Sequence, residues 1–207
     1  MSQPSNIVYF RSLHYGFADP NATICLHWAH LPDSRLHILS ELRRQQMTIE
    51  LLAKDIRTET RRLRIKEIRY TVADEENIGK ESDDGETRAE TFYKAGVTVW
   101  VIKPDPIQGW TRVRELLGIR PDGRPWLTIE PSCTFLIRAL TTAMQDKTNP
   151  EDLMRFGNDQ PLRALRVGAM SRPAPQWFSQ PPLPPKAIGH LVNELRRGPT
   201  DSGLAWR

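Results

Sequence analysis

The residues that could bind a charged ligand are concentrated in one basic segment. Between residues 43 and 69 there are nine Lys or Arg residues and four Asp or Glu residues. Arg57, Arg61, Arg62 and Arg64 belong to a predicted amphipathic helix at residues 48–64, away from its apolar face. Such a stripe either faces solvent or binds the phosphates of a DNA duplex, with an affinity that falls as salt rises.

Histidines and acids are the other groups that could do chemistry. His27, His30 and His37 fall on predicted strands, and His27 and His30 point to opposite faces because they are three residues apart. They therefore cannot bind one ion together, and we interpret all three as structural. The stretch at residues 74–90 holds eight acids and two bases, which is typical of a solvated loop.

Composition limits the class of protein. Cys25 and Cys133 lie in separate apolar stretches, which predicts two buried, reduced thiols. The first six residues lack the features of a signal peptide, and no apolar run approaches the roughly 18 residues that span a bilayer. The net charge of +4 is compatible with a nucleic-acid partner without requiring one. We expect a cytoplasmic protein with no membrane association.

Hydrophobic patterning predicts the elements that must position these groups. Residues 7–13 and 23–28 read as a hairpin, and residues 35–42 as a third strand of an antiparallel meander. The remaining predicted elements are helix 48–64, strand 68–73, helix 86–95, strand 97–102, helix 106–117, strand 126–129, helix 133–144 and helix 160–170. Strand, crossover helix and strand imply a parallel pair. The predicted class is α/β, with a mixed sheet (antiparallel meander plus parallel strands) flanked by helices, in the order of a ribonuclease H-like fold.

The predicted organisation has one domain and extended ends. Residues 1–6 are expected to be a flexible N-terminus, and residues 7–170 to form the domain. Residues 171–185 hold six prolines in fifteen positions, which predicts an extended arm. The arm is either a strap over the domain or an exposed protein-docking segment. Residues 186–207 are expected to form a short helix and a tail.

Four segments resemble the nuclease domain of phage terminase large subunits, over about residues 7–173. SLHYGFADP resembles the first-strand motif S-L-D-x-G-x-x-x-P, and TVAD, ending at Asp74, resembles the fourth-strand segment. GWTRVRELL and DGRPWLTIEPSC resemble the helix and strand that follow. NDQPLRALRVGAMSRP resembles the motif D-H-x-x-D-A-L-R-Y-G-x-M-S-R-P. The resemblance implies a ribonuclease H-like fold.

The resemblance also implies a chemistry. Members of that family cut concatemeric viral DNA during packaging, with two divalent ions held by carboxylates, because Mg²⁺ prefers oxygen ligands. Asp74 and Asp159 match two of the acids, and His14 stands where the family has the first aspartate. Arg163 replaces the acid that usually lies nearest the metals. Gln160 and Val167 replace the histidine and the tyrosine of the last motif. A single ion held by Asp74, Asp159 and His14 is the remaining metal hypothesis.

These replacements predict a weak metal site. Neutral imidazole is a poor ligand for Mg²⁺, though tolerable for Mn²⁺ or Zn²⁺. A guanidinium about 4 Å from a divalent ion costs about 8 kcal/mol at an effective dielectric of about 20. We expect no cofactor, or Mg²⁺ or Mn²⁺ if the site is active. Two features could rescue the site. The first is a pair between Asp159 and Arg163, which are four apart on a helix, because pairing would turn the arginine aside. Replacement ligands could come from Asp19, Glu75, Glu76, Asp83 and Asp84.

The expected function is a terminase-nuclease-like domain of phage or prophage origin with lost or weak DNA cleavage that retains DNA or protein binding. The chain holds no G-x-x-x-x-G-K-[ST] motif and has no room for a motor domain, so it is not expected to translocate DNA alone. One alternative is an active two-metal endonuclease that cuts concatemeric DNA during packaging. Another is a non-catalytic inhibitor or regulator of a nucleoprotein complex. The expected partners are double-stranded DNA and a protein of a phage or host nucleoprotein assembly.

Overall fold

A six-stranded mixed sheet forms the centre of the domain in the computed structural model, which describes residues 7–17, 22–79, 85–148, 152 and 159–172. The strand order is β5-β4-β1-β2-β3-β6. Pairs β1–β2 and β2–β3 are antiparallel, whereas β1–β4, β4–β5 and β3–β6 are parallel. The strands are β1 Val8–His14, β2 Thr23–His30, β3 Leu36–Arg44, β4 Thr71–Asp74, β5 Val99–Ile102 and β6 Leu127–Ile129. This confirms the predicted mixed sheet.

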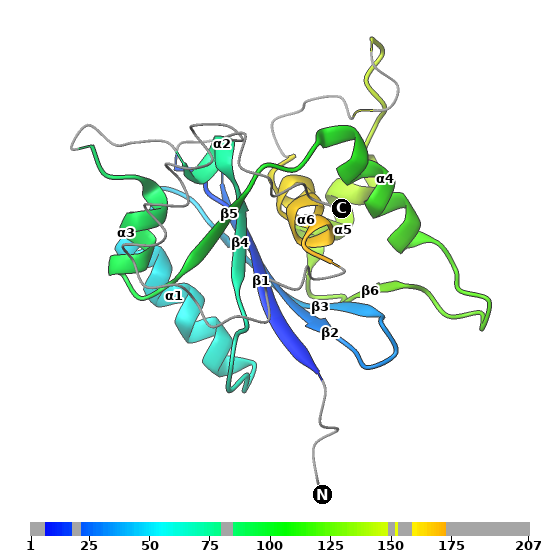
Figure 1. Ribbon diagram of the computed structural model, residues 1–207, viewed down its shortest axis with the longest axis horizontal. Helices are drawn as coiled ribbons and strands as arrows, with labels where there is room; N and C mark the ends of the chain where they lie inside the picture. Colours follow the sequence, from blue (N-terminus) through cyan, green and yellow to red (C-terminus); the bar gives the residue numbers. More distant parts are fainter. Residues whose placement is uncertain (1–6, 18–21, 80–84, 149–151, 153–158, 173–207) are drawn as a thin grey trace, which may run out of the picture.

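Helices cover both faces of the sheet. Figure 1 shows α1 and α3 on one side and α4, α5 and α6 on the other. The helices are α1 Ile49–Arg62, α2 Glu75–Ile78, α3 Arg88–Lys94, α4 Pro106–Leu117, α5 Thr134–Thr142 and α6 Gln160–Met170. In the described part of the chain, no helix is long and apolar enough to cross a bilayer.

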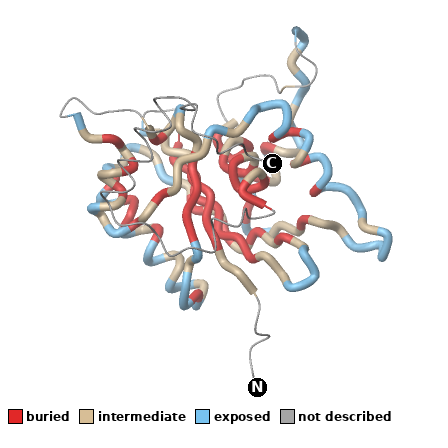
Figure 2. Tube along the Cα trace, viewed as in Figure 1, coloured by how far each residue is buried: buried red, intermediate tan, exposed pale blue. Residues whose placement is uncertain are grey.

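Two hydrophobic clusters hold these layers together because alternate strand residues point to opposite faces. Leu13 and Cys25 pack in the cluster of α1 and α3. Ile24 and Trp28 pack with the residues of α5 and α6 in the other cluster. Figure 2 shows the buried residues concentrated along the central strands and α6. Cys25 and Cys133 are buried free thiols in different clusters, as expected.

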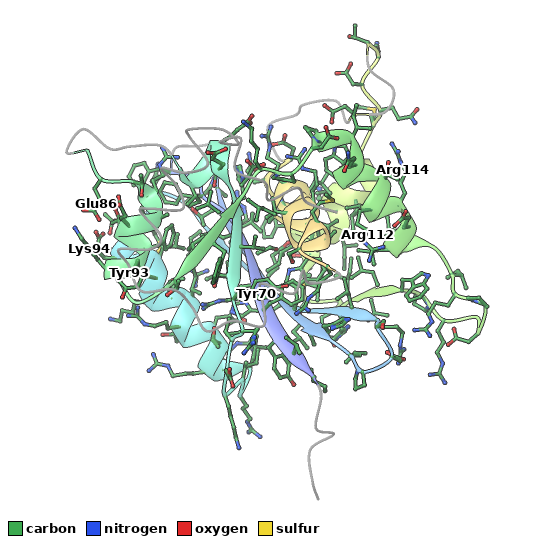
Figure 3. The ribbon with its side chains drawn as sticks, viewed as in Figure 1. Tyr70, Glu86, Tyr93, Lys94, Arg112 and Arg114 are labelled. Carbon is green, nitrogen blue, oxygen red and sulfur yellow. The ribbon has the colours of Figure 1, made fainter. Side chains whose placement is uncertain are left out.

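Close packing sets the position of α6 over β1 and β2. A Cβ at Gly168 would lie 2.5 Å from Cζ2 of Trp28, so only glycine permits this approach. Trp28 in turn donates a hydrogen bond from Nε1 to Oγ of Ser12, at 2.9 Å. At the far end of α6, Tyr70 Oη lies 3.1 Å from Ser171 Oγ (Figure 3). These contacts place the side chains of α6 against the sheet.

The elements lie close to the predicted ranges, with one addition. α2 was expected to be loop; it begins because Asp74 caps it, with Oδ1 accepting from the backbone N of Glu76 at 3.0 Å. α3 ends at Lys94 with Ala95 as its C-cap, and the next residue, Gly96, has a φ of 82° in the left-handed region. His27, expected to be structural, is fully buried. Most of the predicted arm at 171–185, together with residues 1–6 and 186–207, lies outside the described residues.

Candidate functional site

A pocket of about 450 Å³ opens where β1 and β4 end. His14 is the last residue of β1 and Asp74 the last of β4. Because these strands are parallel neighbours, with Leu13 opposite Ala73, their carboxyl ends meet at one edge of the sheet. The residues lining the pocket are His14, Asp74, Glu75, Glu76, Asn77, Gly79, Arg163 and Arg166.

Asp74 is engaged on both carboxylate oxygens. Oδ1 caps α2, and Oδ2 accepts a hydrogen bond from Nη2 of Arg166 at 3.3 Å. Burial raises the pKa of Asp74, and the hydrogen bond from Glu76 and the charge of Arg166 oppose that rise without cancelling it. Both side chains of the pair are largely buried, at 11% exposure for Arg166 and 14% for Asp74.

The position of Arg166 is set by α4. Its guanidinium carbon lies 5.4 Å from the ring centroid of Trp110. A Cβ at Gly109 would lie 2.5 Å from Cγ of Arg166, so the arginine passes over the helix where a side chain is missing. The side chain of Arg166 is therefore packed between α4 and α6 where it extends toward Asp74. This packing limits how far the side chain can move.

Arg163 and Asp159 form an ion pair, as their spacing predicted. Nε and Nη2 of Arg163 lie 2.9 and 2.8 Å from Oδ2 of Asp159. The pair turns Arg163 toward Asp159, while its side chain still lines the pocket. Asp159 is not among the described residues that line the pocket with Asp74.

His14 is a neutral group in this site. Burial, together with the charges of Arg163, Arg166 and Arg88, lowers the pKa of His14 to about 3. Because protonation of the ring would add a fourth positive charge beside three guanidinium groups, His14 is uncharged at neutral pH.

The basic residues predicted on α1 lie on the opposite face of the sheet from α6 (Figure 1). Arg62 pairs with Glu59 at 2.7 Å, Arg61 donates to Oγ1 of Thr58 at 3.2 Å, and Arg57 donates to the backbone O of Ala95. Arg64 follows the helix with a φ of 56°. None of the four lines the pocket at Asp74, and their role in binding nucleic acid stays a prediction.

Only some carboxylates of the acidic stretch at residues 74–90 line the pocket at Asp74. Glu75 and Glu76 line the pocket, and Glu75 lies 3.9 Å from Nζ of Lys103. Glu86 pairs with Lys94 at 2.6 Å on α3, at the outer side of the molecule (Figure 3). Three predicted replacement ligands lie outside the described residues: Asp19, Asp83 and Asp84.

Sequence reasoning missed Arg166. Arg163 and Arg166 are three residues apart, so a helix at residues 160–170 places both on neighbouring positions of one face. That spacing, together with the arginine that the resembled motif D-H-x-x-D-A-L-R-Y-G-x-M-S-R-P has at this position, was the signal that could have found it. The partner of Arg166, Asp74, is 92 residues away in the chain and carries no local mark of the contact.

Comparisons with solved structures give consistent similarities to one group of proteins. The P22 large terminase nuclease domain superposes with a TM-score of 0.63 at 14% identity, covering 83% of this chain and 84% of that one. The large terminase of a thermophilic bacteriophage gives 0.63 at 17% identity, covering 83% of this chain and 41% of that one. The nuclease domain of the bacteriophage SPP1 large terminase with bound Mn gives 0.52 at 16% identity, covering 80% and 86%.

The chain has the fold of a phage large-terminase nuclease domain. It spans less than half the length of the large terminase from the thermophilic bacteriophage, which it matches over 41% of that chain. No protein-family model matches the sequence, and a search of curated proteins gives no match. At these identities the superpositions establish the fold, whereas the chemistry depends on the residues in the pocket.

Arg166 lies beside the carboxylate of Asp74 in the pocket of this fold. Among the described residues, no three His, Cys, Asp or Glu side chains gather to hold one. An ion bound to Oδ2 of Asp74 at about 2.1 Å would lie within about 4–5 Å of Arg166, a repulsion of about 8 kcal/mol at an effective dielectric of about 20. The guanidinium of Arg166 is the charged partner of Asp74 in this structure.

Proposed function

We propose that this chain is a DNA-binding domain of the terminase-nuclease fold, of phage or prophage origin, in which metal-dependent cleavage is lost or weak. The observation that carries the proposal is that His14 and Arg163, which stand where the resembled motifs have aspartates, both line the pocket at Asp74. Two-metal cleavage needs several carboxylates around the ions. Here an imidazole and a guanidinium take the places of two of them.

The similarity to terminase nuclease domains supports DNA as the ligand, together with a net charge of +4. A protein that keeps a basic surface retains the sequence-independent attraction to phosphates even when its metal ligands are gone. Binding is therefore expected to weaken steeply with added salt and to require no divalent ion.

A supercoiled-plasmid assay tests the proposal. The expected result is retention of the plasmid at low salt, with no nicking in Mg²⁺ or Mn²⁺ and no difference between the unaltered protein and Asp74→Ala. Absence of any DNA binding at low salt would overturn the proposal and direct attention to a protein partner in a nucleoprotein assembly.

The second candidate function is an active metal-dependent endonuclease. It is favoured by the SPP1 domain of the same fold, which binds Mn, and by the presence of Asp74 at the end of β4. Plasmid nicking that Asp74→Ala abolishes would establish this function in place of the first.

A further inference from the structure

A second pocket, of about 290 Å³, lies beside the start of α6. Arg43 at the end of β3, Phe135 and Arg138 of α5, and Gln160 of α6 contribute to its lining. Its volume is at the low end of pockets that bind small organic molecules, about 300 Å³. The DNA-binding function proposed above was inferred without any of these side chains.

The charges around this pocket favour an anion. Two guanidinium groups line it, and none of the described lining residues is acidic. In the described part of the chain neither Arg43 nor Arg138 forms an ion pair, although burial raises the pKa of Glu41 and the charge of Arg43 is among the interactions that oppose this rise. The nearby carboxylate of Glu41 accepts hydrogen bonds from the backbone N of Phe135 and Leu136, at 3.0 and 2.6 Å. It therefore satisfies backbone N–H groups at the start of α5. The pocket at Asp74, by contrast, is lined by three carboxylates.

An aromatic ring lies against one of these charges. The guanidinium carbon of Arg43 lies 4.6 Å from the ring centroid of Phe135. Phe135 nevertheless keeps 47% of its surface exposed, which is unusual for a phenylalanine beside a hydrophobic core. A partly exposed aromatic ring in a pocket that also holds two guanidinium groups is a combination on which an unpaired nucleobase can stack while its phosphate meets the guanidinium groups.

The two pockets occupy the same edge of the sheet. His14 pairs with Ile24, and Ile24 pairs with Arg43, so Arg43 lies two strands from His14, or about 10 Å at the usual strand spacing. α6 begins at the second pocket with Gln160 and reaches the first with Arg163 and Arg166. Because three carboxylates line the first pocket, a phosphate is expected at the second.

We propose that Arg43, Phe135 and Arg138 bind one nucleotide of an unpaired DNA strand, with the base on Phe135 and the phosphate on the two arginines. This proposal rests on the proposed DNA binding and specifies an unpaired strand as the form of DNA that is bound. A base pair within a duplex has both ring faces covered by its neighbours, so Phe135 can stack only on an unpaired base.

Fluorescence anisotropy of a labelled oligothymidine of about 12 nucleotides, next to a duplex of the same length, tests the site. Tighter binding of the single strand is expected. Phe135→Ala lowers its affinity by about 5- to 100-fold, the range of one lost stacking contact, and Phe135→Trp retains the affinity. Arg43→Gln with Arg138→Gln lowers the slope of log affinity against log salt by about 0.7 for each phosphate contact.

Arg124→Gln is the matched control. Arg124 is an exposed arginine in a turn at the other end of the sheet, where its neighbour Arg120 contacts Asp33. It is expected to bind the single strand as the unaltered protein does. Equal single-strand affinity of Phe135→Ala and the unaltered protein, in samples with the same circular dichroism, would overturn the site while leaving DNA binding intact. Absence of binding to either oligonucleotide would overturn the proposed function as well.

Discussion

Arg166 and Asp74 meet at 3.3 Å across 92 residues of sequence, in the pocket where β1 and β4 end. The contact joins α6 to the carboxyl end of β4. It neutralises the one carboxylate that the end of β4 presents, and it does so with a group that cannot dissociate.

The first prediction concerns the energy of this pair. In a double-mutant cycle of Asp74→Asn and Arg166→Met, we expect a coupling of about 1–3 kcal/mol, because a largely buried hydrogen bond between charged groups is lost. Asn keeps an oxygen for the cap of α2, so the cap contributes little to the difference. Urea unfolding measures the coupling.

The pair of Arg44 and Asp55 is the control for that cycle. Arg44 is 42% exposed and Asp55 31%, so the same kind of cycle is expected to give less than about 1 kcal/mol. Equal couplings for the two pairs would contradict the stabilising role of burial at Asp74.

The second prediction concerns metal binding. We expect His14→Asp with Arg163→Asp to bind Mn²⁺ weakly while Arg166 remains, and about tenfold or more tightly when Arg166→Met is added, because the repulsion at Asp74 is removed. Titration calorimetry of the two variants measures the difference. Identical Mn²⁺ affinity with and without Arg166 would show that the arginine does not control the site.

The third prediction concerns acid stability. Burial lowers the pKa of His27 to about 3, and the pKa of His14 is also lowered to about 3. In the unfolded chain these groups titrate near about 6.5, so each contributes stability that is complete above that pH and lost as pH falls toward about 3. The free energy of unfolding should fall by up to about 1.4 kcal/mol per pH unit for each histidine below about pH 6.

Urea midpoints between about pH 7 and about pH 5 check this dependence, since most carboxylates stay ionised there. His27 is the better of the two histidines for this test, because the surroundings of both ring nitrogens are defined. Nε2 lies 3.0 Å from Oγ1 of Thr60, and Nδ1 is buried with no hydrogen-bond partner in the described part of the chain. His27→Gln should flatten the curve. An unchanged slope in that variant would refute the assignment.

The fourth prediction compares two basic surfaces. We expect Arg43→Gln with Arg138→Gln to weaken DNA binding more than Arg61→Gln with Arg62→Gln, because Arg62 is already held by Glu59. Each lost phosphate contact lowers the salt slope by about 0.7–0.9. A larger effect from the α1 pair would favour the surface predicted from sequence.

Patterns within short segments determined the elements. Apolar residues at helical spacing placed α1 and α4, and short apolar runs bounded by turn residues placed the hairpin of the meander, because each pattern arises from residues that are neighbours in the chain. The pair of Asp159 and Arg163 was predictable for the same reason, since residues four apart on a helix are adjacent.

The contents of the pocket depended on the tertiary structure. The sequence alone identified His14 and Asp74 by resemblance, but it did not reveal that Arg166 would lie against Asp74 or that Arg43 would lie over Phe135. Those contacts depend on how α6 and α5 are packed on the sheet, and side chains distant in sequence interact only after that packing brings them within a few ångströms. Local periodicity therefore determines which elements form, whereas the electrostatics of a site follow from how those elements pack.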